Sequence, residues 1–445
     1  MKHLIAIIVS LCLAFMPIGA NAVSLIRDAE IEDTLHTYGE PIFKKAGLNN
    51  DAIHIFIVDD LAINAFVAGG ANMFIHTGLI LKTTDPAMLI GVMAHETGHM
   101  AGGHLAQGSE KIQNAQMGAI FSAVLGAAVA VGGSADAGMA VISGGQELAM
   151  RNFLRFTRGN ESAADQAGLN YLDALGISAS GMLRILEILR QDENRSYGNP
   201  DPYTRTHPLN IDRITHIRNH VMQSKIKEDA LPSGYVERHA RMLAKLSGFI
   251  KTPEQTLLAY PVSDNSIPAH YARAIAYYKI PDLPKSLAEM DILLKLKPND
   301  PFFNELRGQI LFENGHIDDS IKSYAKASAL LPRSPLIMSD YGKVLIASES
   351  KDNLAKAVKI LEKSTSIDNS NIDTWHNLAI AYGKSNNLGM FYLATAEENL
   401  LADNIPETIK NADLALKNIV GDKVAKLRAN DIKIIAEKEK AENRK

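Results

Sequence analysis

The sequence predicts a mainly α-helical protein: an α+β domain with a small β-sheet, followed by an all-α superhelix of helical repeats. Three observations predict this fold class. Apolar residues alternate with period two between Asp51 and Leu81, an apolar stretch of helical length runs from Met88 to Met100, and small residues recur at a fixed interval beyond Pro261. Because 445 residues exceed what one hydrophobic core usually organises, we expect two domains.

Composition and charge narrow the class of protein. Apolar residues make up 46% and charged residues 22% of the chain, which excludes a wholly disordered chain and a multi-span membrane protein. The net charge is -4 and the isoelectric point is near 6.4, and no basic stripe alternates with aromatic residues. We therefore expect no nucleic-acid partner.

Residues 1–22 have the layout of a signal peptide. A basic start precedes an apolar stretch from Leu4 to Met16, and Ala20-Asn21-Ala22 provides small residues for cleavage after Ala22. The apolar stretch is short for a membrane span, so a retained anchor is the weaker alternative to export. The only cysteine, Cys12, lies in this segment, and the mature chain is expected to have none.

The first domain should combine two strands with a buried helix. The first strand contains Ile55, and the second runs from Asn72 to Thr77. Asp85-Pro86 then supplies an N-cap and a proline at the first helical position, and Gly102-Gly103 ends the apolar stretch. The sequence His95-Glu96-Thr97-Gly98-His99 therefore lies on a buried helix.

This pentapeptide has the spacing of a metal-binding helix. His95 and His99 are four residues apart and share one helix face, so both imidazoles can hold one ion, and Glu96 can reach the water bound to that ion. Two histidines and a glutamate are costly to bury together unless a cation compensates them. A hydrogen-bonded helix end is the alternative without a metal.

A catalytic zinc takes three protein ligands and leaves a fourth position for water. In the metzincin pattern the third ligand would be at position 105, which is Leu105, and His104 falls one residue short. In the gluzincin pattern it is a glutamate on a later helix, and Glu161 fits if a helix starts with Asn160 as its cap. Asp165 lies one turn further on the same face and can orient a ligating imidazole.

Beyond Pro261 the chain has a 34-residue period. Ala274, Gly308 and Gly342 are spaced by this interval, as are Pro298 and Pro332. The pattern resembles the tetratricopeptide repeat of paired helices, whose superhelix binds peptides or proteins; a plain helical bundle is the alternative. We accordingly predict a signal peptide (1–22), a zinc metalloprotease domain (23–225), connecting helices or linker (226–264), tetratricopeptide repeats (265–420) and a charged C-terminal tail (421–445) that frays.

Several motifs together resemble the HtpX-like zinc peptidases over roughly residues 53–217. The resemblance rests on Asn64-Ala65-Phe66 with Gly69-Gly70, Thr77-Gly78-Leu79, the HETGH motif with His104, residues Arg158 to Asp165, and Thr206-His207-Pro208 with Arg213. It implies a gluzincin-type endopeptidase with one zinc ion per chain, bound by His95, His99 and Glu161, and with Glu96 as general base.

With a signal peptide and repeats, the chain looks like a periplasmic member of this family. That resemblance implies quality control of unfolded or stalled outer-membrane protein substrates, and docking to the β-barrel assembly machinery through the tetratricopeptide groove. Such relatives can carry structural disulfides, for which the mature chain has no cysteine. The alternative function is a chaperone or binding module whose zinc site stays largely closed.

The role of His207 is open between three possibilities: stabilising the oxyanion, occupying the fourth zinc position in a closed state, or packing against its loop. Arg213 could brace the site through Asp165 or Glu161, and His104 is expected to support a ligand. Substrate is expected to pair with an edge strand at Asn72, Phe74 and His76.

An apolar stretch at residues 117–131 needs a place to be buried. It is shorter than the roughly 20 residues that a spanning helix requires, so we expect it to cover the site or to make peripheral membrane contact.

Overall fold

The computed structural model describes residues 24–69, 71–104, 157–195, 203, 207–227 and 231–442. They form two compact units. The first contains the described residues up to Ile26 and from His36 to Leu231, and the second contains Arg27–Leu35 and the described residues from Pro232 onward. The predicted signal peptide and the apolar stretch 117–131 lie outside the described residues. Within the described ranges, no helix combines the length and apolar character that a membrane span requires.

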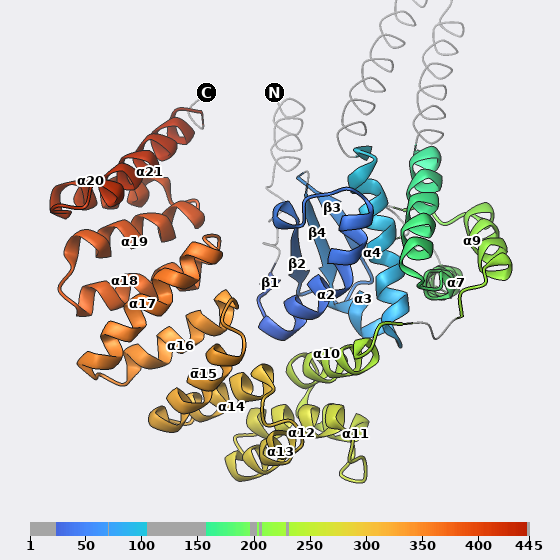
Figure 1. Cartoon of the computed structure of the whole chain (residues 1–445), viewed down its shortest axis with the longest axis horizontal. Helices are drawn as coiled ribbons and strands as arrows, with labels where there is room; N and C mark the ends of the chain where they lie inside the picture. The colour runs from blue at the N-terminus through green and yellow to red at the C-terminus, as the bar shows by residue number, and fades with distance from the viewer. Residues whose placement is uncertain are drawn as a thin grey trace, which may run out of the picture. The chain divides into compact units, whose positions relative to one another are not determined.

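The first unit contains a four-stranded sheet in the order β1-β2-β4-β3 (Figure 1). Its strands are β1 (Leu25–Ile26), β2 (His54–Val58), β3 (Ala65–Ala68) and β4 (Asn72–His76). The two strands predicted from alternation correspond to β2 and β4, which are parallel neighbours. The prediction did not include β1 and β3, which span only 2 and 4 residues and are too short for a recognisable period.

Helices complete this unit, and two of them carry the motifs. They are the second half of α2 (Ala29–Lys45), the 3₁₀ helix η1 (Asn50–Ala52), α3 (Thr77–Lys82), α4 (Pro86–Ala101), a helix over residues 157–175, α7 (Ser180–Arg195) and α9 (Ile211–Gln223). As predicted, Asp85 caps α4 by accepting a hydrogen bond from the Ala87 amide, and Gly102-Gly103 follows its end. The predicted cap at Asn160 is wrong, because the chain is already helical at residue 157.

The second unit consists of helices packed in sequential pairs (Figure 1). They are the first turns of α2, followed by α10 (Tyr235–Ile250), α11 (Pro253–Ala259), α12 (Ile267–Lys279), α13 (Leu283–Leu296), α14 (Pro301–Glu313), α15 (Ile317–Leu330), α16 (Pro335–Ala347), α17 (Lys351–Ile367), α18 (Ile372–Lys384), α19 (Leu388–Leu401), α20 (Ile405–Asn418) and α21 (Lys423–Glu442). The predicted all-α repeat array is confirmed.

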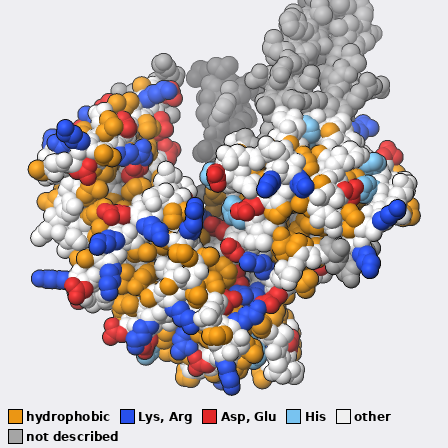
Figure 2. Space-filling model, in the orientation of Figure 1, with side chains coloured by type: hydrophobic (Ala, Val, Ile, Leu, Met, Phe, Trp, Pro, Cys, Tyr) orange, Lys and Arg blue, Asp and Glu red, His pale blue; other side chains and the backbone are white. Residues whose placement is uncertain are grey.

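The 34-residue period has a steric cause. A Cβ atom on Gly308 of α14 would lie 2.6 Å from the Tyr324 ring of α15, and one on Gly342 of α16 would lie 2.5 Å from Leu361 of α17. Each glycine therefore allows a large side chain of the second helix to sit against the backbone of the first. Basic, acidic and apolar side chains are intermixed on the face of this unit seen in Figure 2.

The predicted fraying of the C-terminal tail is wrong for residues 423–442, which form helix α21. Ala425, Ala429, Ile432 and Ala436 are at most 6% exposed, and the first three belong to one apolar cluster with residues of α19 and α20. Their spacing of three or four residues builds an apolar face between the lysines and glutamates, which the high content of charge concealed.

Candidate metal centre

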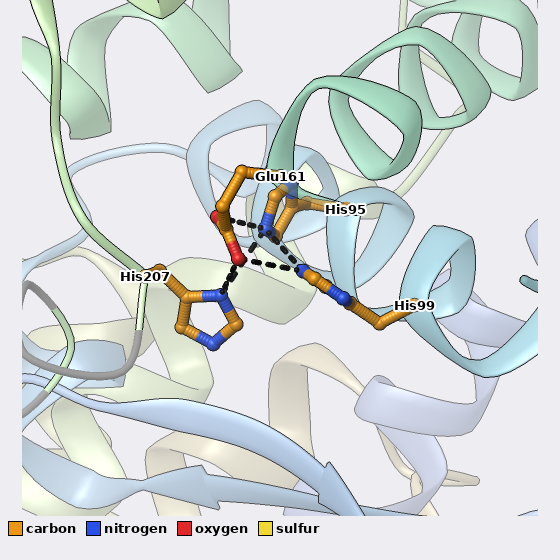
Figure 3. A group of neighbouring side chains, drawn as sticks. All are labelled: His95, His99, Glu161 and His207. Carbon is orange, nitrogen blue, oxygen red and sulfur yellow. Dashed lines mark hydrogen bonds and ion pairs between the residues drawn. The ribbon is translucent and has the colours of Figure 1, made fainter. Parts of the chain in front are cut away.

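Helix α4 brings its two histidines to one buried point (Figure 3). His95 and His99 are 1% and 7% exposed, and their Nε2 atoms lie 3.1 Å apart. The four-residue spacing places both rings on the same helix face. Two imidazole nitrogens pointing at one position are the beginning of a metal site.

Glu161 reaches the same point from the helix over residues 157–175. Its Oε1 lies 3.2 Å from His99 Nε2, and its Oε2 lies 3.4 Å from His95 Nε2. The carboxylate thus faces both imidazoles from a separate helix, as the gluzincin pattern predicts.

A glycine in the motif allows this close approach. A Cβ atom on Gly98 would lie 2.7 Å from the carbonyl oxygen of Ala164, three residues beyond Glu161. The two helices can therefore meet at this distance only because position 98 has no side chain.

We expect Gly98→Ala to lower peptidase activity about 10²-fold, because separating the two helices displaces Glu161 from the histidines. Activity and metal content of the purified variant are the measurements. Gly159→Ala is the matched control, since a Cβ there meets nothing within 4 Å. Full activity of Gly98→Ala would contradict this role of the glycine.

His207 is the fourth member of the group (Figure 3). Its Nδ1 lies 3.1 Å from Glu161 Oε1 and 3.4 Å from His95 Nε2. The Tyr203 ring stacks on the His207 imidazole with a centroid distance of 4.6 Å, and the His207 amide donates to the Tyr203 carbonyl. The donor atoms of His95, His99, Glu161 and His207 all lie within 4.8 Å of one another, so these four side chains could hold a metal ion.

The other predicted supporting residues surround this group. Asp165 Oδ1 lies 2.9 Å from His95 Nδ1, which fixes the ring so that Nε2 faces the centre. Arg213 donates to both oxygens of Asp165 at 2.7 and 2.8 Å. Its Nη1 lies 2.7 Å from Glu161 Oε2. His104 Nδ1 lies 3.0 Å from His99 Nδ1. These contacts hold the histidines and Glu161 in place from behind.

Glu96 is fully buried beside the group, and neither carboxylate oxygen has a hydrogen-bond partner among the described residues. Its Oε1 lies 3.5 Å from His207 Nε2. Burial raises the pKa of Glu96, which makes it a better proton acceptor than an exposed glutamate.

The charges of the site fit a divalent cation. Glu96, Glu161 and Asp165 contribute three carboxylates against the single guanidinium of Arg213, which leaves two uncompensated negative charges when the carboxylates are ionised and the imidazoles are neutral, as metal ligation requires. Burial by itself would lower the pKa of His95, but hydrogen bonds to Asp165 and Glu161 outweigh this effect and raise the pKa to about 9. The site therefore attracts positive charge. Nitrogen and carboxylate donors match the ligand preference of zinc.

The expected substrate-pairing strand is not an edge strand. Strand β4 pairs with β2 on one side and with β3 on the other, so Asn72, Phe74 and His76 cannot offer a free backbone. The Phe74 ring is stacked between those of Phe56 and Phe66. The prediction failed because alternation identifies a strand but not its neighbours.

An HExxH helix whose histidines converge with a glutamate from a second helix defines a metallopeptidase site. Residues 29–221 match the model of Peptidase family M48, so the chain contains an M48 domain and is a metalloprotease. The predicted metalloprotease is confirmed at the level of this domain.

Related proteins cover most of the chain. It is 26% identical over 403 residues to the putative beta-barrel assembly-enhancing protease of Vibrio cholerae serotype O1. This match covers 89% of the present chain and 82% of the Vibrio protein. It is 25% identical over 396 residues to the beta-barrel assembly-enhancing protease of Escherichia coli strain K12, with 87% and 79% covered. A match to metalloprotease LoiP of the same strain is 27% identical over 165 residues, covering 37% and 61%.

Proposed function

We propose that the chain is a zinc-dependent endopeptidase in which His95, His99 and Glu161 bind one zinc ion and Glu96 is the general base. The observation that carries the proposal is the buried Glu96 carboxylate, which has no hydrogen-bond partner in the described part of the chain and adjoins the converging donor atoms. When bound, zinc would polarise the scissile carbonyl and lower the pKa of water. Comparing zinc content and substrate degradation between the wild type and Glu96→Gln tests the proposal.

The chain's own residues would then divide the work. Glu96 takes a proton from the attacking water and returns it to the leaving amine. Asp165 keeps the His95 ring oriented by accepting from Nδ1, and Arg213 holds the carboxylates of Asp165 and Glu161 in position. His104 contacts the outer nitrogen of His99 in the same way.

The setting of this activity is part of the proposal. The predicted signal peptide and the names of the full-length relatives support a periplasmic protease of outer-membrane β-barrel quality control. Unfolded or stalled barrel proteins would be substrates, and the repeats would dock to the barrel assembly machinery. Peripheral membrane contact through residues 117–131 also remains a proposal.

The position of His207 favours a second function besides turnover. Its Nδ1 is placed among the donors of the proposed metal site, where it would complete a four-ligand, closed centre. In that state the chain would act as a binding module, and displacement of His207 would free the position that water needs. A Glu96→Gln variant that complements every loss-of-function phenotype would support binding as the main role.

We expect His207→Ala to raise basal cleavage of a loosely folded substrate several-fold, because removing the fourth donor opens the site to water. The measurement is the initial rate of degradation at equal zinc content. His216→Ala, at an exposed position on α9, is the control and should behave as the wild type. Lost activity would assign His207 to oxyanion stabilisation, and unchanged activity would reduce it to packing.

A further inference from the structure

The N-terminal segment Arg27–Leu35 is part of the helical unit, although the rest of α2 belongs to the unit with the sheet. Within the helical unit it contacts several successive helices. Arg27 pairs with Asp368 after α17 at 2.8 Å. Ala29, 5% exposed, lies in one apolar cluster with Phe302 of α14 and Ile337 of α16. The segment thus follows the array from repeat to repeat, as a peptide ligand does.

Two acidic residues make the buried polar contacts of the segment. Asp28 accepts from Lys245 Nζ of α10 at 2.8 Å. Glu30 accepts from Arg241 of α10 at 2.7 Å and from the Tyr271 hydroxyl of α12 at 2.6 Å. Glu30 is 2% exposed and Lys245 is 3% exposed, so these are buried, charge-assisted contacts.

Asp28 also begins the helix that it anchors. Its Oδ1 accepts from the Glu30 and Ile31 amides, which caps α2. The pattern presented to the repeats is therefore an acidic helix start with the sequence Asp-X-Glu. The position of this helix start along the repeats is fixed because Asp28 caps the helix and Glu30, two residues later, accepts from Arg241.

The receiving surface is organised by its own residues. Arg241 is held by Asp300 at 2.6 and 3.0 Å and lies over the Phe303 ring at 4.1 Å. Lys245 also lies 3.9 Å from Glu305. Both cations would therefore keep a carboxylate neighbour if the segment left. A surface that is compensated without its occupant can exchange that occupant.

We propose that Arg241, Lys245, Tyr271 and Phe303 form a recognition site for an acidic peptide that starts a helix with Asp-X-Glu. The chain's own residues 27–35 fill this site as an intramolecular ligand. An acidic peptide of the same pattern competes for it, and its binding releases the first turns of α2. The proposal is independent of the metal site.

A full-length variant whose own residues 27–35 no longer fill the site tests the proposal. The probe is a fluorescent peptide of residues 28–38, and the variant carries Asp28→Asn with Glu30→Gln. We expect the variant to bind the peptide at least tenfold more tightly than the wild type, whose site is filled at a high effective concentration. A peptide with the same two substitutions should not bind. The control Glu40→Gln, at an exposed position of α2, should match the wild type. Equal affinity of the folded double variant and the wild type overturns the proposal.

A milder variant covers the case in which the double variant does not fold. Tyr271→Phe removes one hydrogen bond to Glu30 and should raise trypsin cleavage after Arg27 about fivefold, because the segment leaves its site more often. Excess unlabelled peptide should raise the same cleavage in the wild type. Unchanged cleavage in both experiments would mean that the segment is a permanent part of the fold.

Discussion

Replacing Glu96 by glutamine is expected to lower the turnover of a loosely folded protein substrate by about 10²- to 10⁴-fold while zinc content stays unchanged. Glutamine has nearly the same shape, so the packing around this buried position is preserved. It cannot take a proton from water at neutral pH. The measurements are the single-turnover cleavage rate and the metal content of the purified protein.

The comparison needs a control for loss of charge alone. Glu40→Gln removes an exposed carboxylate from α2 and should leave turnover unchanged. His99→Ala should lose both zinc and activity, which separates metal binding from proton transfer. Wild-type turnover by Glu96→Gln would refute the role of Glu96 as general base.

Arg213→Met is expected to lower the free energy of unfolding of the metal-free protein by about 3–5 kcal/mol. The Asp165 and Glu161 carboxylates would lose their shared guanidinium inside the protein. That guanidinium, after the opposing effect of burial, lowers the pKa of Asp165 through a direct hydrogen bond. Zinc affinity should fall about 10- to 100-fold as the ligands lose their support.

Urea unfolding of the chelated protein and zinc titration measure these two effects. Arg218→Met is the matched control on the same helix, because Arg218 pairs with Glu187 at half-exposed positions and should cost less than about 1 kcal/mol. If both variants lose equally little stability, the Arg213 contacts do not support the site.

The part of the metal site that lies on one helix could be predicted from the sequence, because the helical repeat fixes the relative positions of its side chains. The four-residue interval between His95 and His99 places both rings on one helix face, and a catalytic zinc site then requires a third protein ligand. That requirement identified Glu161 as a candidate, and the structure places its carboxylate beside both histidines. Their functions as ligands remain predictions that the substitutions above would test.

Other features depend on contacts between distant elements, which the periodicity of the sequence does not reveal. Alternation located strand β4 but could not reveal β3 on its far side, so Phe74 was misjudged as an edge residue. The need for glycine at position 98 follows from a carbonyl on another helix. The apolar face of α21 consists largely of alanines, which carry a weak hydrophobic signal among many charges.

The contacts between residues 27–35 and the repeat helices imply an order of events during folding. Glu30 and Tyr271 are separated by 241 residues, and Arg27 and Asp368 by 341. Synthesis proceeds from the N-terminus, so this segment leaves the ribosome before the repeat helices and gains its partners only after those helices have been made. Docking of the segment closes both of these long loops. Until then the receiving surface of the repeats is open, and a newly made chain differs from a mature one in what it can bind.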